Sequence, residues 1–519
     1  MTIASMADIV RVHAAERGDK VALIDGDRSF TFNELADRSA RVAQALAASG
    51  VVSGDRVAFF DKNSAEHFDV FYGAAMLNAV CVDPNWRLAP PEVQFIVDNA
   101  GAKVLVVGGE FIDMIDSIAD QLPTVEKIVV IGEHPKYDSF DAWMGSFDPV
   151  DPQAPSEGSD IAFQLYSSGT TGRPKGVMLS NDNFFGMLPM AREIWELEET
   201  SINLAAMPLF HIGGGGWATA GMYNGCTTVI MRDLDPMALA GLIEKHKITH
   251  AFVVPAVLAF MQFAPDLDAS QLASMEIVVY GASPISEEVL KQSVALFNCK
   301  FWQAYGLTET TGGVFNLPPE DHDPDGPNAH RLRSCGVAGP GVEVRIVDEE
   351  GTDVPTVGDV GEIWVKSLQV MAGYWKNPEA TAEAIVDGWF KTGDAGYMDA
   401  DGYLYIHDRV KDMIVSGGEN VYPAEVENAM MSHPEIQDVA VIGVPDDKWG
   451  EVPKAIVVPI ADASPDPAEI LAYARERLAG FKTPKSVDFV TELPRNPTGK
   501  VLKKDLRAPF WEGRERSVN

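Results

Sequence analysis

The chain has 519 residues, of which 46% are hydrophobic and 23% charged, as is usual for a globular protein. At this length one hydrophobic core no longer suffices, so at least two domains are expected. Lys and Arg total 41 and Asp and Glu total 76, which gives a formal net charge of −35. This excess of negative charge argues against nucleic acid or an anionic membrane as a partner, and a polyanionic substrate would need local positive groups.

The cysteines and the N-terminus indicate where the protein resides. The four cysteines lie far apart without a CxxC pair, as expected in a reducing compartment. The start of the chain lacks the charged and apolar regions of a signal peptide, and no apolar run reaches about 18 residues. We therefore expect a cytoplasmic protein without a transmembrane segment. The sequence leaves the oligomeric state open, with a homodimer as one option.

The first part of the chain alternates between strand-like and helical segments. A short strand leads into a helix that begins with the capping box Thr31 and Glu34 and ends at Gly50. Farther on, the apolar runs 102–108 and 126–132 flank a segment with helical spacing of its isoleucines. This alternation indicates βαβ units and a parallel sheet.

The pattern changes twice toward the C-terminus. Apolar segments punctuated by glycine continue from about residue 201 into the strand-like runs 275–283 and 300–306. After residues 339–351, short strands with Gly and Asp turns predict a small β-rich part. From residue 423 the order helix, strand, strand, helix, strand predicts a compact α+β domain of its own.

Glycine and hydroxyl side chains dominate the segment YSSGTTGRPKG at 166–176, directly after the strand-like IAFQLY. A glycine-rich turn after a strand lets successive N–H groups point into one concavity, so phosphate is the expected guest. The segment is not a Walker A loop, because Lys175 lies between Pro174 and Gly176. Taken alone, such a loop is as often a flexible connection as a phosphate site.

The same segment resembles the signature loop of the adenylate-forming enzymes, which include acyl-CoA synthetases, aryl-CoA ligases, beetle luciferases and peptide-synthetase adenylation domains. Further segments follow in that family's order: PLFH at 208–211, YGASP at 280–284, YGLTE at 305–309, GWFKTGD at 388–394, DRVKDMIVSGGENVYPAEVE at 408–427 and PRNPTGKVLK at 494–503. The resemblance therefore covers essentially the whole chain.

The resemblance implies an α/β fold with two unequal domains. A large N-terminal domain, residues 1–408, would consist of two α/β layers and a distorted β-barrel. A hinge at 409–411, centred on Lys411, would join it to a small mobile α+β lid, residues 412–519. The lid has to move, because Lys500 and the thiol of coenzyme A need the same approach to the reacting carbonyl.

The chemistry explains why such residues are needed. A carboxylate is a poor electrophile and has to be activated. Its attack on the α-phosphorus of ATP gives an acyl adenylate and releases pyrophosphate. This step needs charge stabilisation more than covalent catalysis. The resemblance assigns ATP contacts as follows: Ser167, Ser168, Gly169, Thr170, Thr171 and Lys175 to the β and γ phosphates, Thr308 to the α phosphate, Tyr305, Gly306, Gly281, Ala282 and Ser283 to adenine, and Asp394 and Arg409 to the ribose.

Two further residues carry the catalytic roles in this resemblance. Glu309 would hold Mg²⁺, a hard cation that prefers carboxylate and phosphate oxygens. Lys500 would bring its flexible ammonium group to the pentavalent phosphorus and to the attacking carboxylate. Without the surrounding motifs, Lys500 would be an ordinary surface lysine.

The resemblance places the other substrates less firmly. It implies contacts to coenzyme A from Ser416, Gly417 and Gly418, and an acyl pocket at His211, Gly215, Trp217 and Gly313. His211 is expected to act as a gate or positioning group, although a lone histidine after an apolar run is usually a core residue. The glycines at 213–216 stand where some long-chain members have a bulky aromatic, which predicts an open pocket mouth. The GGEN segment at 417–420 favours an aliphatic or alicyclic acid.

The sequence thus predicts an enzyme, an ATP- and Mg²⁺-dependent acid:CoA ligase for a fatty or other apolar acid. One alternative is an aryl-acid CoA ligase. Another is a fatty acyl-AMP ligase, which passes the adenylate to a carrier protein and usually has an inserted segment that is not obvious here. A non-catalytic nucleotide-binding protein is disfavoured, because Glu309, Asp394, Arg409 and Lys500 are all present.

Overall fold

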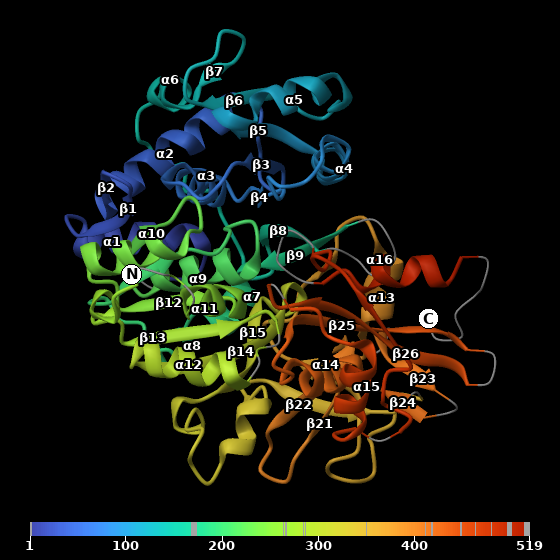
Figure 1. The fold of residues 1–519 in the computed structure, drawn as a ribbon. Helices are drawn as coiled ribbons and strands as arrows, with labels where there is room; N and C mark the ends of the chain where they lie inside the picture. The colour runs from blue at the N-terminus through green and yellow to red at the C-terminus, as the bar shows by residue number, and fades with distance from the viewer. Residues whose placement is uncertain are drawn as a thin grey trace.

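The computed structural model describes residues 3–512, apart from 168–173, 263, 265–266, 284, 286, 349, 410–411, 417–418, 447–448, 462, 479 and 496–500. For residues 236, 407–409, 415, 419–420 and 450 it describes the backbone alone. Within these residues the strands form four sheets. Figure 1 shows the N-terminal layer at the top, a second α/β layer at the lower left and the C-terminal part at the lower right.

The N-terminal sheet is parallel over most of its width and is built from βαβ units. Its strands run in the order β19 (Gly373–Tyr374), β9 (Lys175–Ser180), β8 (Ile161–Ser167), β4 (Val80–Val82), β3 (Arg56–Phe60), β5 (Ala102–Gly108), β6 (Lys127–Ile131) and β7 (Asp138–Ser139). The helices of this layer are α2 (Phe32–Ala48), α3 (Ala65–Met76), α4 (Pro90–Ala100), α5 (Ile112–Ile118) and α6 (Phe140–Gly145), with the 3₁₀ turns η1 (Gly109–Phe111) and η2 (Ala119–Gln121).

Local signals in the sequence explain two of these helices. The Thr31 side chain accepts from the Glu34 N–H and the Glu34 carboxylate accepts from the Thr31 N–H, so α2 begins with the predicted capping box. The isoleucines at 112, 115 and 118 of α5 are buried together against β5 and β6. The predicted strands and helices of this layer are confirmed.

The second sheet also has a parallel centre, with antiparallel strands at both edges. Its order is β16 (Val337–Ala338), β15 (Gly312–Leu317), β14 (Lys300–Leu307), β13 (Ile277–Gly281), β12 (His250–Val253), β10 (Ile202–Ala205), β11 (Thr227–Ile230), β1 (Val21–Asp25) and β2 (Arg28–Thr31). Its layer holds α1 (Met6–Arg17), α7 (Asn181–Met187), α8 (Met190–Ile194), α9 (Ile212–Tyr223), α10 (Pro236–His246), α11 (Pro255–Gln262) and α12 (Glu287–Phe297), with η3 (Ala269–Leu272), η4 (Thr308–Thr310), η5 (Pro319–Asp321) and η6 (Ala329–Arg333).

One hydrophobic core joins the two layers, because buried residues of α1, α2, α3 and α9 pack together with both sheets. The β-rich part expected as a distorted barrel is an antiparallel sheet of β17 (Glu343–Val347), β18 (Gly361–Lys366), β21 (Trp389–Met398) and β20 (Ile385–Val386), with β22 (Leu404–Arg409) paired to β21. The helix α13 (Pro378–Ala384) lies beside it.

The C-terminal part has its own sheet and its own cores. The strands are β24 (Glu419–Val421), β23 (Ile414–Ser416), β26 (Gly450–Pro459) and β25 (Ile436–Asp446), with β27 (Ser486–Phe489) beside β26. Residues of α14 (Pro423–Met431) and α15 (Pro467–Arg475) join one buried cluster of the sheet, and residues of α16 (Lys503–Arg507) and η8 (Ala508–Phe510) join another. The predicted α+β order of this part is confirmed. The chain passes from the β-rich sheet to the C-terminal sheet between residues 409 and 414. The predicted hinge residue Lys411 lies outside the described residues, so the hinge stays a prediction.

Candidate active site

A buried carboxylate lies where the two α/β layers meet. Glu309 belongs to η4, which directly follows β14, and is 9% exposed. Its Oε1 accepts from the Ser167 hydroxyl at 3.0 Å and from the Tyr374 hydroxyl at 3.1 Å. Ser167 is the last residue of β8 and Tyr374 lies in β19, so the carboxylate joins the end of β14 to two strands of the other sheet.

A lysine lies beside this carboxylate. Lys175 begins β9, where it is the register partner of Ser167. Its Nζ lies 4.8 Å from the centroid of the Tyr374 ring, a cation–π distance. The structure therefore brings together Ser167, Lys175 and Glu309, which are predicted to hold the phosphates and the metal ion.

The backbone after Glu309 is held in a strained turn. Thr311 adopts φ +51°, a left-handed conformation that is unfavourable for a β-branched residue. Its Oγ1 donates to the Gln369 carbonyl at 2.6 Å, and Gln369 Nε2 donates to the Gly313 carbonyl at 3.0 Å. Strain of this kind is typical of functional sites, where the surrounding contacts enforce it.

The residues predicted for the ribose also lie together. The Tyr305 hydroxyl donates to Asp394 Oδ2 at 2.6 Å, and Asp394 is 5% exposed. Asp394 lies on β21, where it is the register partner of Arg409 on β22. The β-rich sheet thus brings the Asp394 carboxylate to the Tyr305 ring of β14.

The predicted adenine residues follow β13 and end β14. A Cβ on Gly281 would lie 2.1 Å from the Ala304 carbonyl oxygen, and one on Gly306 would lie 1.8 Å from the Gly312 carbonyl oxygen. Both positions need glycine because another backbone segment approaches closely. Ala282 adopts φ +67°, so the turn that carries Ala282 and Ser283 is strained as well.

The base of the predicted phosphate loop is fastened to its surroundings by a polar network. The Tyr166 hydroxyl donates to Asn99 Oδ1 at 2.7 Å, and the Trp375 indole donates to the Asn99 carbonyl at 2.9 Å. The Arg56 guanidinium stacks on Trp375, with Cζ 3.4 Å from the centroid of its ring. Burial lowers the pKa of Arg56 to about 10. Because the Trp375 backbone N–H also donates to the Gly176 carbonyl of β9 at 2.7 Å, the network holds both β8, which enters the loop, and β9, which leaves it.

His211 caps helix α9. Its Nδ1 accepts from the Gly213 N–H at 3.1 Å, which leaves the ring proton of the neutral imidazole on Nε2. Asn63 supports the preceding segment: its Nδ2 donates to the Met207 carbonyl at 3.0 Å and its Oδ1 accepts from the Leu209 N–H at 3.0 Å. The position of His211 is therefore set by α9 and by Asn63.

The glycines after His211 do not form an open pocket mouth, and that expectation is wrong. They lie in the first turns of α9, where Gly214, Gly215 and Gly216 are buried. A Cβ on Gly214 would lie 2.1 Å from the Pro208 carbonyl oxygen, and one on Gly215 would lie 2.6 Å from the Leu209 carbonyl oxygen. The glycines let the helix approach the backbone of residues 207–209.

The other predicted acyl residues are Trp217 and Gly313. Trp217 is 5% exposed, and its ring centroid lies 5.6 Å from that of Trp195 and 6.3 Å from that of Phe252. A Cβ on Gly313 would lie 3.8 Å from Trp195 Cζ2. Trp217 and Gly313 therefore both lie next to Trp195, and their acyl role stays a prediction.

Several predicted residues cannot be placed. Ser168, Gly169, Thr170, Thr171, Lys411, Gly417, Gly418 and Lys500 lie outside the described residues, as does the side chain of Arg409. Thr308 lies half-buried in η4, and Ser416 is buried in β23. The described residues hold no group of three or more His, Cys, Asp or Glu side chains arranged for a metal ion.

Sequence reasoning missed Tyr374, Gln369 and Asn63. No sequence spacing connects Tyr374 to Glu309, because the connection depends on β19 pairing with β9. Gln369 and Asn63 act through hydrogen bonds to the backbone of distant segments. Tyr374 could have been identified only by predicting that residues 373–374 pair with β9.

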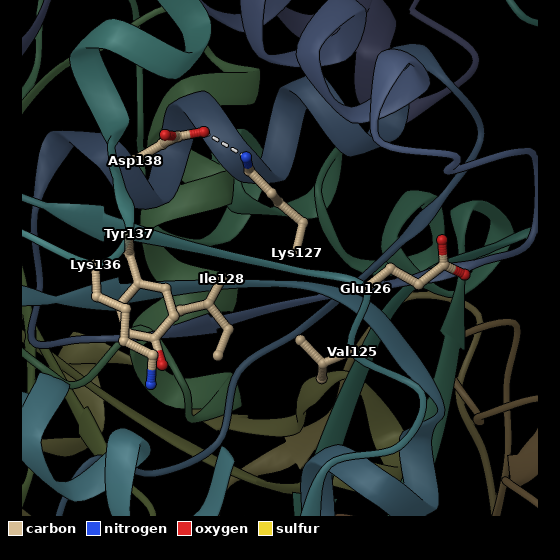
Figure 2. A pocket seen from close by; sticks show the side chains of 7 residues that line it. All are labelled: Val125, Glu126, Lys127, Ile128, Lys136, Tyr137 and Asp138. Atoms are coloured by element: carbon tan, nitrogen blue, oxygen red, sulfur yellow. Dashed lines mark hydrogen bonds and ion pairs between the residues drawn. The ribbon is translucent and has the colours of Figure 1, made fainter. Parts of the chain in front are cut away.

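A shallow hollow at the far edge of the N-terminal sheet lies away from these residues. It is lined by Val125, Glu126, Lys127, Ile128, Lys136, Tyr137 and Asp138, and Lys127 pairs with Asp138 across it (Figure 2). These residues surround β6 and β7, whereas the predicted phosphate residues lie on β8 and β9 at the other side of the same sheet. We assign this hollow no part in the chemistry.

Comparison with known proteins identifies the family. Residues 10–375 match the AMP-binding enzyme family, and residues 425–500 match the AMP-binding enzyme C-terminal domain. The chain belongs to the AMP-binding enzymes. The predicted membership and the α/β fold with a large N-terminal and a smaller C-terminal domain are thereby confirmed, while the exact domain boundaries stay predictions. In the described residues of this AMP-binding enzyme, no helix has both the length and the apolar character needed to cross a membrane.

Relatives of this AMP-binding enzyme act on several acids. The chain is 40% identical to the fatty acid–[acyl-carrier-protein] ligase ScoC of Streptomyces coeruleorubidus over 98% of this chain and 96% of that protein. It is 36% identical to a feruloyl-CoA synthase of Amycolatopsis over 94% and 96% of the two chains. Among solved structures, the anthranilate CoA ligase AuaEII in complex with anthranoyl-AMP has a TM-score of 0.89 and 30% identity, with 98% of each chain covered.

The close approach of α9 generates a prediction. Gly215→Ala should reduce kcat/KM for every acid by a similar factor, because the added methyl group pushes α9 away from the Leu209 carbonyl. Overpacking of this kind should lower the free energy of unfolding by about 1–3 kcal/mol, measured by denaturant titration. Gly145→Ala in α6 is the control, because a Cβ there meets no atom within 4 Å. Loss of activity confined to long or ring-bearing acids would contradict the prediction.

Proposed function

We propose that this AMP-binding enzyme is an ATP-dependent acid:CoA ligase. It activates a carboxylic acid as an acyl adenylate, releases pyrophosphate, and transfers the acyl group to the thiol of coenzyme A. The single observation that carries the proposal is the Glu309 carboxylate, which lies within hydrogen-bond distance of Ser167 at the entrance of the phosphate loop. Tyr305, on the strand β14 that leads into Glu309, donates to Asp394 on β21, and this pair is suited to a nucleoside.

Different described residues are proposed to bind different parts of ATP. Ser167 offers a hydroxyl and Lys175 a positive charge to the β and γ phosphates. Asp394 accepts hydrogen bonds from the ribose hydroxyls, and the Tyr305 ring stacks on adenine. Because the chain carries a net charge of −35, the local charge of Lys175 is needed to hold a polyphosphate at all.

The proposed metal ion is Mg²⁺, held by Glu309. Mg²⁺ is usually bound by one or two carboxylates together with substrate phosphates, so one buried carboxylate beside a phosphate loop fits it. The Ser167 and Tyr374 hydroxyls both donate to Oε1, which orients the carboxylate. When bound, Mg²⁺ neutralises charge that develops on the phosphates.

Lys500 is proposed to stabilise the pentavalent phosphorus during adenylation. It belongs to the C-terminal part, which is proposed to rotate about residues 409–411 between the two half-reactions. The rotation would withdraw Lys500 and bring Ser416 and the glycines at 417–418 to coenzyme A.

A carrier protein is the second candidate acceptor. ScoC is named for transfer to an acyl-carrier protein, and it is 40% identical to this chain over nearly all of its length. Both acceptors present the same thiol chemistry, so the residues that form the adenylate do not distinguish them. The acid is proposed to be a fatty or other largely apolar acid, with an aryl acid as the alternative that the feruloyl-CoA synthase supports.

One experiment tests the activity and the acceptor together. Purified protein is incubated with ATP, Mg²⁺ and a panel of fatty, alicyclic and aryl acids, with coenzyme A, a phosphopantetheinylated carrier protein or hydroxylamine as the acceptor. Acyl-CoA formation supports the ligase, and thioester on the carrier alone supports the second candidate. Hydroxamate alone indicates an enzyme that stops at the adenylate, and no product with any acid contradicts acid activation.

Glu309→Gln should reduce kcat for acid-dependent pyrophosphate release by roughly a hundredfold, because the amide lacks the charge that Mg²⁺ needs. Tyr374→Phe should show a milder effect in the same direction, about 1 kcal/mol, because it removes one hydrogen bond to Oε1. Both variants should bind the acid normally. The exposed Glu157→Gln is the control, and turnover of Glu309→Gln that equals wild type at limiting Mg²⁺ would refute the metal assignment.

Lys500→Ala should abolish adenylation yet leave thioester formation from a supplied acyl adenylate largely intact, because the ammonium group acts only at phosphorus. The two half-reactions are measured separately, by pyrophosphate release and by thioester formation. We expect a loss of roughly a hundredfold or more in the first alone. Lys504→Ala is the control on the same segment. Comparable loss in both half-reactions would remove Lys500 from this role.

A further inference from the structure

One face of α9 lies directly on the second sheet. Gly213, Trp217 and Gly221 are spaced four residues apart, which places them on the same side of the helix. A Cβ on Gly213 would lie 2.9 Å from Phe252 Cε1, and one on Gly221 would lie 2.3 Å from Asn203 Nδ2. Phe252 and Asn203 belong to β12 and β10, so this face covers the centre of the sheet.

Trp217 carries a hydrogen-bond donor on this face that no described residue satisfies. The side chain is 5% exposed, and its Nε1 has no hydrogen-bond partner among the described residues. The neighbouring Trp195 differs, because its Nε1 donates to Asn316 Oδ1 at 3.3 Å. The indole of Trp217 therefore keeps a buried N–H without an acceptor.

A second donor without a partner among the described residues belongs to Asn316, which contacts Trp195. Asn316 on β15 is 4% exposed and accepts from Trp195 through Oδ1. Its Nδ2 finds no acceptor in the described part of the chain. Asn316 lies three residues from Gly313, a predicted acyl residue, so both donors border the region where the acid is expected.

Further polar groups without hydrogen-bond partners among the described residues lie near Gly221, one turn beyond Trp217 on α9. Asn203 is fully buried, and neither Oδ1 nor Nδ2 of its amide has a partner within the residues described. Thr228, its register partner on β11, is also fully buried, and its Oγ1 is unpartnered in the same part of the chain. The polar groups thus follow α9 from Trp217 to Gly221.

Leaving such groups unpaired is energetically unfavourable, and buried polar atoms normally have a partner. Asn63 in the same core shows the usual situation, because its amide makes hydrogen bonds through both Nδ2 and Oδ1. A purely hydrocarbon acyl chain next to Trp217 and Asn316 would leave both donors unpaired. An oxygen atom of the substrate would satisfy them.

We propose that the acid activated by this enzyme carries an uncharged oxygen acceptor, a hydroxyl, oxo or ether group, that receives hydrogen bonds from Trp217 and Asn316. This inference rests on the proposed function and names the substrate class of that same site. Both donors are neutral, so they match an uncharged oxygen better than a second carboxylate, which would need a cation. Trp217 and Asn316 are specificity-determining residues in this proposal.

The geometry of α9 predicts how far the oxygen lies from the reacting carboxyl group. Trp217 is six residues beyond His211, which corresponds to about 9 Å along the helix axis, and Gly221 is about 15 Å beyond His211. The oxygen is therefore expected several carbons away from the carboxyl group that reacts with ATP.

The test compares acids that differ only by one oxygen. Decanoate and its monohydroxy and mono-oxo derivatives, with the oxygen at successive carbons, are assayed by hydroxamate formation with ATP, Mg²⁺ and hydroxylamine, so the acceptor does not matter. For wild type we expect kcat/KM of the best oxygenated acid to exceed that of decanoate by about tenfold or more, with an optimum at an interior carbon. Trp217→Phe, which keeps an aromatic ring but removes the indole N–H and the pyrrole ring that carries it, should abolish most of this preference.

Trp143→Phe is the matched control, because Trp143 is a buried tryptophan of α6 whose Nε1 already donates to Ser49 Oγ at 3.3 Å. It should leave the preference unchanged. Equal use of decanoate and every oxygenated acid by wild type would overturn the proposal and leave the ligase function standing. A preference that survives in Trp217→Phe would also overturn it. If Trp217→Phe does not fold, the wild-type comparison decides alone, and hydroxamate from no acid at all would overturn both this proposal and the proposed function.

Discussion

The Glu309 carboxylate is the point on which the arrangement of the site depends. It follows a strand of the second sheet and accepts hydrogen bonds from Ser167 and Tyr374, which belong to the first. A buried carboxylate loses its hydration, so these two hydroxyls are required to stabilise it. The same contacts link the ends of β8 and β14. Tyr305 lies on β14 and Glu309 on the η4 turn directly after it, so the residues proposed for the nucleoside and for the metal ion are carried by one continuous segment.

The sequence predicted the elements well, and several residues predicted to bind the nucleotide lie close together, for physical reasons that differ between the two. Strands such as β5 and β6 are continuous apolar runs because both of their faces are buried, and α2 is marked by its capping box. Ser167, Glu309, Tyr305 and Asp394 lie in motifs that a resemblance can carry over. Tyr374 could not be found in this way, because its role depends on the pairing of a two-residue strand with β9. The glycines after His211 suggest an open pocket mouth in the sequence, but a sequence does not distinguish space left for a ligand from space filled by another backbone.

Helix α9 shows how one segment serves several requirements. Its N-terminus holds His211, its first glycines let it approach residues 207–209, and its inner face carries Trp217. A helix so rich in glycine has low intrinsic stability, since each glycine costs about 1 kcal/mol relative to alanine. Tertiary packing has to offset that cost, and the side chains of α9 are buried almost throughout. At this closely packed interface, Trp217 Nε1 and the Asn203 amide have no hydrogen-bond partner among the described residues.

The net charge of −35 gives the mobile C-terminal part a further role in the proposed mechanism. Bringing ATP into a strongly acidic protein is unfavourable unless positive groups lie close to the phosphates. Lys175 begins β9, and its Nζ lies over the ring of Tyr374, whose hydroxyl donates to Glu309. In the proposed mechanism Lys500 comes from the C-terminal part, so the positive charge around the nucleotide would be complete only when that part closes. Much of the negative charge that would favour closure leaves with pyrophosphate. The loss of charge would then weaken the closed arrangement at the step where Lys500 has to make room for the incoming thiol, and it would couple the order of the two half-reactions to electrostatics.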